Sequence, residues 1–289
     1  SGDCTRRFAR RLGGTLLMGQ GPHGEIMSRG KGAGMNSGSL LTWTQPRFVA
    51  HIAATFLTVV LFAHHASARA SGLVAPWPAD AQAPLPGAWK AQYHPDIAAH
   101  TRFSLVEKAG VTLLQANANQ SYGTLVHAFA QPQVLSTMGW AWQVLEHPAQ
   151  AKLQTKAGDD AGAKVCAFVQ IDESRLSLGT RLALGAARTL SGEPLPAATL
   201  CYVWGSPGEP VGMVFNNPYT DRVKNMVLRD SSPGGGMVTE SRDLQADARL
   251  AFGKELPDGP VRFTGIALGT DADNTKSKAT ALFGSIVAK

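Results

Sequence analysis

Short runs in which apolar and polar residues alternate dominate the sequence between residues 102 and 287. A period of two is typical of β-strands, because successive side chains of a strand point to opposite faces. Turn-forming residues separate the runs, and Lys108-Ala109-Gly110 joins the first two in the pattern of a β-hairpin. The expected strands are 102–107, 111–116, 122–129, 139–145, 163–171, 199–204, 211–215, 222–228, 237–241, 261–268 and 279–287.

Two segments have helical spacing instead. Leucine or alanine recurs at every fourth position within 174–190, and the segment 243–252 is followed by Gly253, a residue favoured at helix C-termini. Many short strands with two helical connections predict an all-β fold. The expected architecture is a two-sheet antiparallel β-sandwich, jelly-roll-like, with one or two short helices in its connections.

The excess of positive over negative charge comes from the N-terminal quarter of the chain. The net charge is +6, with 27 Lys and Arg against 21 Asp and Glu. Residues 1–70 hold eight of these bases and two of the acids, which leaves 19 of each sign in 71–289. A neutral domain without blocks of like charge lacks the footprint of a nucleic-acid-binding protein, so no nucleic-acid partner is expected.

The basic N-terminal part leads into an uncharged apolar stretch, 48–63, followed by small residues up to Ala70. This order is typical of a secretory signal, and the apolar run is shorter than the ~20 residues of a membrane span. An uncleaved N-terminal anchor is the alternative. We expect a periplasmic or secreted protein without a stable membrane span after cleavage. The expected boundaries are a disordered basic extension at 1–34, a secretory signal at 35–70, a Pro/Ala-rich lead-in at 71–100 and the β-sandwich at 101–289.

Two cysteines follow the expected signal. Cys166 and Cys201 each lie inside a strand-like run. An oxidising compartment permits a disulfide between them if the two strands are neighbours. The alternative is that they are two small buried side chains that never meet, and the sequence leaves both open.

A series of short motifs gives the chain a resemblance to a known family. In order, they are Trp140-Ala141-Trp142, the segment 158–165, Leu200-Cys201-Tyr202-Val203-Trp204, Asn217-Pro218-Tyr219-Thr220, Glu240-Ser241-Arg242-Asp243, Asp247 with Ala251-Phe252-Gly253, and the segment 270–275. Over about 85–287 this series resembles the bacterial domain of unknown function 3047 family. The family pattern leads us to expect Arg after the Asp pair, whereas this sequence has Lys164 at that position. The resemblance implies an exported or envelope protein and brings no established activity.

The densest group of oxygen-bearing side chains follows the expected strand 261–268. It reads Gly269-Thr270-Asp271-Ala272-Asp273-Asn274-Thr275. Carboxylate and amide oxygens that converge from one tight loop are typical ligands of hard cations and of polyols. The sequence therefore predicts a metal site formed by Asp271, Asp273 and Asn274, with calcium as the expected ion.

Other polar and aromatic residues are candidates for ligand binding. Asp243 and Asp247 are four residues apart on the second expected helix, hence on one face. Trp140 and Trp142 share one face of a strand, where they either stack on a sugar ring or fill the core. The candidates are Asp159, Asp160, Arg242, Asp243, Asp247, Trp140 and Trp142. Alternatively, the carboxylates pair with Arg242 and Lys164 in a structural ion network.

These patterns favour binding over catalysis. The expected function is an exported module that binds a glycan or another envelope component, and no catalytic residue is assigned. One alternative is a glycoside hydrolase or lyase that uses Asp160 and Asp273 as its pair of carboxylates. Another is a structural envelope protein without a small ligand. The histidines of the domain lack ligand spacing such as H-E-x-x-H, and the oligomeric state is left open.

Overall fold

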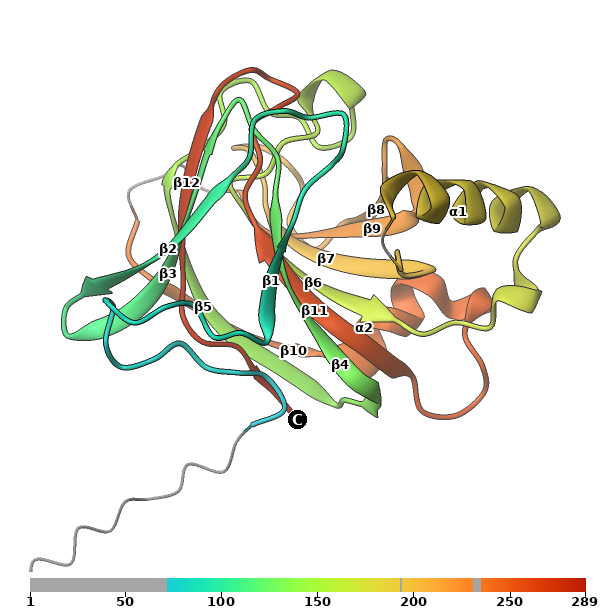
Figure 1. The fold of residues 1–289 in the computed structure, drawn as a ribbon. Helices are drawn as coiled ribbons and strands as arrows, with labels where there is room; N and C mark the ends of the chain where they lie inside the picture. The colour runs from blue at the N-terminus through green and yellow to red at the C-terminus, as the bar shows by residue number, and fades with distance from the viewer. Residues whose placement is uncertain (1–71, 193, 231–234) are drawn as a thin grey trace, which may run out of the picture. The chain divides into compact units, whose positions relative to one another are not determined.

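Two curled β-sheets pack face to face in the computed structural model of the chain (Figure 1). The structure describes residues 72–192, 194–230 and 235–289. The predicted basic extension and secretory signal lie outside the described residues. The described range contains both sheets and the core between them.

The larger sheet has seven strands in the order β1-β4-β11-β6-β7-β9-β8. Its neighbours are antiparallel except for β7 and β9, which are parallel. The bounds are β1 Trp89–Gln92, β4 Thr124–Val134, β6 Ala163–Val169, β7 Ala198–Trp204, β8 Val214–Asn217, β9 Thr220–Arg229 and β11 Arg262–Gly269. Because β1 lies inside the Pro/Ala-rich lead-in, regular structure begins before residue 101.

The smaller sheet follows the order β10-β5-β12-β3-β2, and β13 also pairs with β5. The bounds are β2 Arg102–Lys108, β3 Val111–Asn119, β5 Thr137–Glu146, β10 Val238–Asp243, β12 Lys278–Phe283 and β13 Val287–Ala288. The expected strand 279–287 is thus divided, because the chain leaves the β12 ladder at Gly284 and pairs again only at β13. The predicted two-sheet β-sandwich is confirmed.

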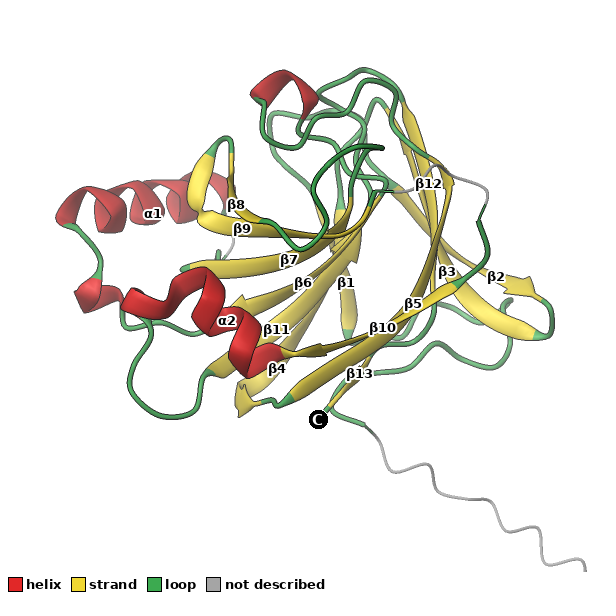
Figure 2. Cartoon of the chain, turned by 180° about the vertical axis from the view of Figure 1, so that it is seen from behind, coloured by secondary structure: helices red, strands yellow, loops and turns green. Residues whose placement is uncertain are grey.

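Both predicted helices are present. Helix α1 (Leu178–Ser191) begins after Ser177, whose side chain accepts the Thr180 N–H, and ends at Gly192 with a φ of 67°. Helix α2 (Leu244–Phe252) begins after Asp243, whose carboxylate accepts the Ala246 N–H. Three short 3₁₀ turns are η1 Lys156–Gly158, η2 Glu173–Arg175 and η3 Gly253–Glu255. Figure 2 shows α1 outside both sheets and α2 against the strands. No helix among the described residues is both long and apolar enough to cross a membrane.

The core between the sheets is rich in aromatic rings. On β5, Trp140 is 2% exposed and Trp142 is fully buried. Trp140 lies 5.2 Å from Tyr202, and Trp142 lies 5.5 Å from Trp204, as measured between ring centroids. The two tryptophans thus contact rings of the opposite sheet. The sequence left two roles open for these tryptophans, and the structure shows that they fill the core.

Cys166 and Cys201 form a disulfide. They lie directly opposite each other on the antiparallel neighbours β6 and β7, with their Cα atoms 4.0 Å apart. Adjacent strands bring the two thiols together, which decides between the alternatives that the sequence left open.

Candidate functional site: an acidic rim

Two loops that are distant in the sequence meet at one end of the larger sheet. Strand β6 begins and strand β11 ends at this point, because Lys164 pairs with Gly269 in their ladder. Residues just before β6 and just after β11 are therefore neighbours. This register brings the predicted residues Asp159, Asp160, Asp271, Asp273 and Asn274 together, and we call these five residues the acidic rim.

Asp160 fastens one loop to the other. Its buried carboxylate accepts the N–H groups of Asn274 at 3.1 Å and Thr275 at 2.7 Å. It also accepts the Thr275 hydroxyl at 2.5 Å. A buried carboxylate is stabilised by several donors of this kind. Asp160 therefore has mainly a structural role in the rim, because its carboxylate oxygens already accept these hydrogen bonds.

Asp271 is buried and forms an ion pair with Lys164. Its other oxygen accepts the Ala161 N–H at 2.9 Å. The Lys164 ammonium lies 5.1 Å from the centroid of the Tyr122 ring. Burial opposes the charge of Lys164, but the facing carboxylate of Asp271 more than offsets it and holds the lysine pKa above its usual range. Lys164 thus neutralises one of the four carboxylates.

Asp159 and Asp273 are only half-buried and keep a proton more readily than ordinary aspartates. Burial, followed by the nearby charge of Asp271, raises the pKa of Asp159 from 3.8 to about 7. Burial and the charges of Asp271 and Asp160 also raise the pKa of Asp273. Among the described residues, no ion pair is formed by Asp159, Asp160 or Asp273, and Lys164 pairs with Asp271.

Three carboxylates of the rim are close enough to share one ligand. One oxygen each from Asp160, Asp271 and Asp273 lies within 4.8 Å of the others. Oxygens that surround a calcium ion at 2.3 to 2.6 Å have separations of this order. The arrangement is chemically suited to a hard cation or to the hydroxyl groups of a polyol.

An exposed aromatic ring borders the rim. Tyr219, in the turn between β8 and β9, is 57% exposed. Its hydroxyl lies 2.8 Å from the Asn274 side-chain oxygen, and its ring lies 5.2 Å from the Lys156 ammonium. Asn217, the last residue of β8, donates its side-chain N–H to Asp159 at 2.5 Å. A ring, two amides and carboxylates are thus available on one surface.

Arg242, Asp243 and Asp247 are not part of the rim. Arg242 on β10 donates two hydrogen bonds to Asp247 of α2, at 2.9 and 2.8 Å, and Tyr202 of β7 donates a third at 2.8 Å. Asp243 caps α2. Gln245 of this helix forms hydrogen bonds with Val261, just before the start of β11. The rim follows the other end of β11. Arg242 and Asp247 instead connect the two sheets.

Comparison with known protein families assigns the chain to one of them. Residues 87–287 match the family described as protein of unknown function (DUF3047). The chain belongs to the DUF3047 family. No curated protein matches the chain.

Several solved structures share a weak likeness with this DUF3047 protein. The first is a cellulase derived from Cel12A of Rhodothermus marinus, with 14% identity over 70% of this chain and 97% of the cellulase, at a TM-score of 0.36. Cel12A of Rhodothermus marinus itself has 12% identity, the same coverage and a TM-score of 0.34. The xyloglucanase domain of NopAA from Sinorhizobium fredii, in complex with cellobiose, has 13% identity over 74% and 93%, with a TM-score of 0.32. At these values the likeness assigns no activity to the DUF3047 chain.

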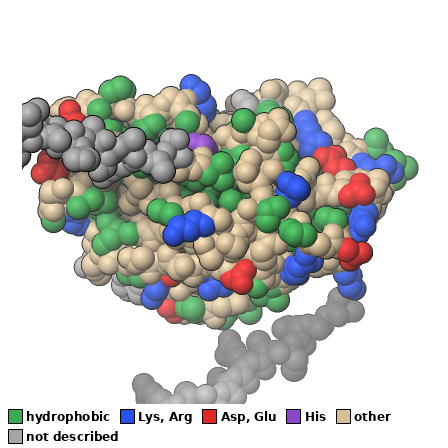
Figure 3. All heavy atoms as spheres, turned by 90° about the horizontal axis from the view of Figure 1, so that it is seen from below, with side chains coloured by type: hydrophobic (Ala, Val, Ile, Leu, Met, Phe, Trp, Pro, Cys, Tyr) green, Lys and Arg blue, Asp and Glu red, His purple; other side chains and the backbone are tan. Residues whose placement is uncertain are grey.

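The charges of the DUF3047 domain do not form a face of one sign in the view of Figure 3, where basic and acidic side chains are interspersed. On this face, the distribution agrees with the even balance of acidic and basic residues in 71–289.

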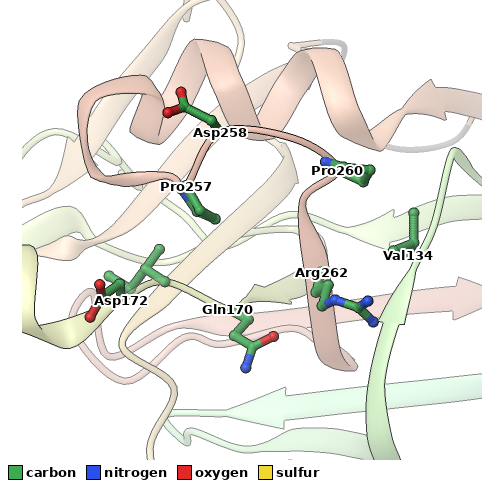
Figure 4. Close-up of a pocket in the computed structure, with 8 residues that line it drawn as sticks. Val134, Gln170, Asp172, Pro257, Asp258, Pro260 and Arg262 are labelled. Atoms are coloured by element: carbon green, nitrogen blue, oxygen red, sulfur yellow. The ribbon is translucent and has the colours of Figure 1, made fainter.

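A separate hollow lies at the other end of β11. It has a volume of about 420 Å³, and Arg262 at the start of β11 lines it (Figure 4). Asp172 and Asp258 also line it, so the lining has mixed charge. None of the site residues predicted from the sequence lines this hollow.

Some residues that contact the rim were not predicted as site residues. Tyr122 carries no recognisable motif, Asn217 and Thr275 were noted only as parts of longer motifs, and Lys164 was expected only as an ion-pair partner in the structural alternative. The register of β6 against β11 places Lys164 beside Asp271, and such a register becomes visible only once the strand order is known.

Proposed function

We propose that this DUF3047 protein is an exported, non-catalytic module whose acidic rim binds a glycan or another polyhydroxylated envelope component, with a calcium ion held between its carboxylates. The observation that carries the proposal is the approach of the Asp160, Asp271 and Asp273 oxygens to within 4.8 Å, beside the exposed ring of Tyr219.

The electrostatics of the rim support a bound cation. Four carboxylates face one lysine, and the pKa values of Asp159 and Asp273 are raised by burial first and then by the charge of the neighbouring Asp271. A divalent cation would relieve this repulsion and complete the oxygen shell that calcium prefers.

The border of the rim supports a polyol ligand. Sugar rings bind proteins through stacking on an aromatic face and through hydrogen bonds to carboxylates and amides. Tyr219, Asn217 and Asn274 provide these groups on an accessible surface. Trp140 and Trp142 are buried and take no part.

Export is supported by two independent features. The N-terminal sequence has the order of a secretory signal, and the described domain contains a disulfide. Structural disulfides persist in oxidising compartments such as the periplasm. We therefore propose that the protein lies in the bacterial envelope or outside the cell.

Calcium titration of the domain 72–289 tests the cation. At pH 8, calcium should raise the melting temperature and chelation should reverse the effect. Asp273→Asn should abolish the response, while Asp258→Asn, an exposed aspartate in the separate hollow, should leave it intact. No response of the wild-type domain to calcium would remove the cation from the proposal and leave a structural cluster.

A glycan array tests the polyol. Tyr219→Ala should lose binding, whereas Tyr219→Phe should retain most of it, because the ring stays and only the hydroxyl is removed. Equal binding by the wild type and Tyr219→Ala would exclude this surface as the ligand site.

One observation favours a second candidate function. A carboxyl group with a pKa of about 7, such as that of Asp159, is a proton donor at neutral pH. A glycoside hydrolase or lyase with Asp159 as its acid would release reducing ends from a bound glycan and lose this activity in Asp159→Asn. Binding without release of reducing ends would favour the module.

A further inference from the structure

Helix α1 carries an apolar stripe on its exposed side. Leu178 is 64% exposed, Leu182 66% and Leu190 80%. Residues four apart lie on one face of a helix, and at 3.6 residues per turn these three leucines span an arc of about 120°. Leu184 alone among the fourteen residues of α1 is buried, so the side that faces solvent holds most of the apolar surface of the helix.

The few buried side chains of α1 give a second reason to expect a partner. Leucine, alanine and arginine make up nine of its fourteen residues and favour the helix, whereas Gly179, Gly185 and two threonines weaken it. Most of the stability of a protein helix comes from packing of its apolar face. With one buried side chain, α1 obtains little of this stability from the domain. A surface that covers the leucines would supply it.

The charges of α1 indicate the kind of partner. The helix has two arginines and no acidic residue. Arg188 pairs with Glu173, whereas Arg181 has no ion-pair partner in the described part of the chain. A helix with an uncharged leucine face and arginine at its margin is typical of segments that lie in the interface of an anionic membrane.

The position of α1 makes this contact possible. Figures 1 and 2 both show the helix at the periphery of the domain, beside β8 and β9 and outside the two sheets. A helix of 14 residues is about 21 Å long and about 10 Å wide, so one face projects about 200 Å². A stable dimer needs about 800 Å² from each partner, which argues against a second copy of the chain.

We propose that α1 docks the folded domain on an anionic phospholipid surface, with Leu178, Leu182 and Leu190 in the acyl boundary and Arg181 at the headgroups. This surface is independent of the acidic rim. The helix lies in the plane of the membrane and does not span it.

Vesicle sedimentation tests the proposal on the domain 72–289, which contains the complete core and lacks the apolar N-terminal segment. The domain should sediment with vesicles of phosphatidylglycerol and phosphatidylcholine, and higher salt should weaken the binding. Leu182→Gln with Leu190→Gln should weaken it at least about tenfold. Arg181→Gln should weaken binding about fivefold on the anionic vesicles and leave binding to pure phosphatidylcholine unchanged.

The matched control is Leu250→Gln, because Leu250 is 67% exposed but belongs to α2. It should bind as the wild type does. Equal binding by the double leucine variant, or no binding by the wild type, would overturn the proposal. A wild-type dimer in solution that the leucine substitutions dissociate would assign the stripe to a second copy and would also overturn it.

Discussion

The buried carboxylate of Asp160 accepts the backbone N–H of Thr275 at 2.7 Å, although 115 residues separate the two in the sequence. This contact joins the loop before β6 to the loop after β11. It fixes the positions of the other rim carboxylates, so the geometry of the proposed site depends on a residue whose own oxygens are mostly occupied.

Asp160→Ala should destabilise the domain by about 3 kcal/mol, because the substitution leaves several donors in a buried place without their charged acceptor. Denaturant unfolding measures the change. Asp273→Asn is the control, and in the absence of calcium it should be neutral or slightly stabilising, since it removes a repelled charge. A loss under about 1 kcal/mol in Asp160→Ala would show that the loops are held without it.

Asp159 should make the domain less stable as the pH rises. Its pKa is about 7 in the folded protein and 3.8 in the unfolded chain, so folding favours the protonated form. The contribution is fully present below pH 3.8 and is lost as the pH passes through 7. Melting curves of the wild type and Asp159→Asn should therefore diverge over this window. Parallel curves from pH 4 to 8 would contradict the raised pKa.

Asp247→Ala should cost about 3 kcal/mol, because it leaves the Arg242 guanidinium and the buried Tyr202 hydroxyl without their shared acceptor. Asp243→Ala removes only a helix cap and should cost about 1 kcal/mol. Chemical denaturation of both variants compares them. Similar losses would mean that the contact between the sheets is worth no more than the cap.

Reduction of the disulfide should lower the free energy of unfolding by about 4 kcal/mol in the chain-entropy model, since the bond closes a loop with a sequence separation of 35. A comparison of the wild type with Cys166→Ala/Cys201→Ala, each with and without reductant, measures the effect. Only the wild type should respond. A protein that carries two free thiols after purification from an oxidising compartment would contradict the pairing.

Much of the fold could be predicted from local patterns. Alternation identified the strands, and the spacing of leucines identified α1. The division of the last expected strand was missed because Gly284 interrupts the ladder without ending the apolar run. The pairing of Cys166 with Cys201 could not be decided, since it depends on β6 and β7 being neighbours.

The site was predictable only in part. Oxygen-rich loops are visible in the sequence, so Asp271, Asp273 and Asn274 were recognised as a group. Arg242 was predicted as a ligand-binding residue, but its strand β10 lies at the edge of the other sheet, where Arg242 pairs with Asp247. Burial decides whether Trp140 and Trp142 fill the core or form a binding platform. The alternation of residues along one strand does not reveal which of its faces is buried.

Strand β8 is the outermost strand of the larger sheet, and no other strand among the described residues pairs with its free edge. Free edges recruit strands from other molecules and start aggregation. This edge is only four residues long, and Pro218, which has no N–H to donate, follows it at once. The edge of β8 therefore offers few backbone groups to a strand of another molecule, which disfavours fibril growth.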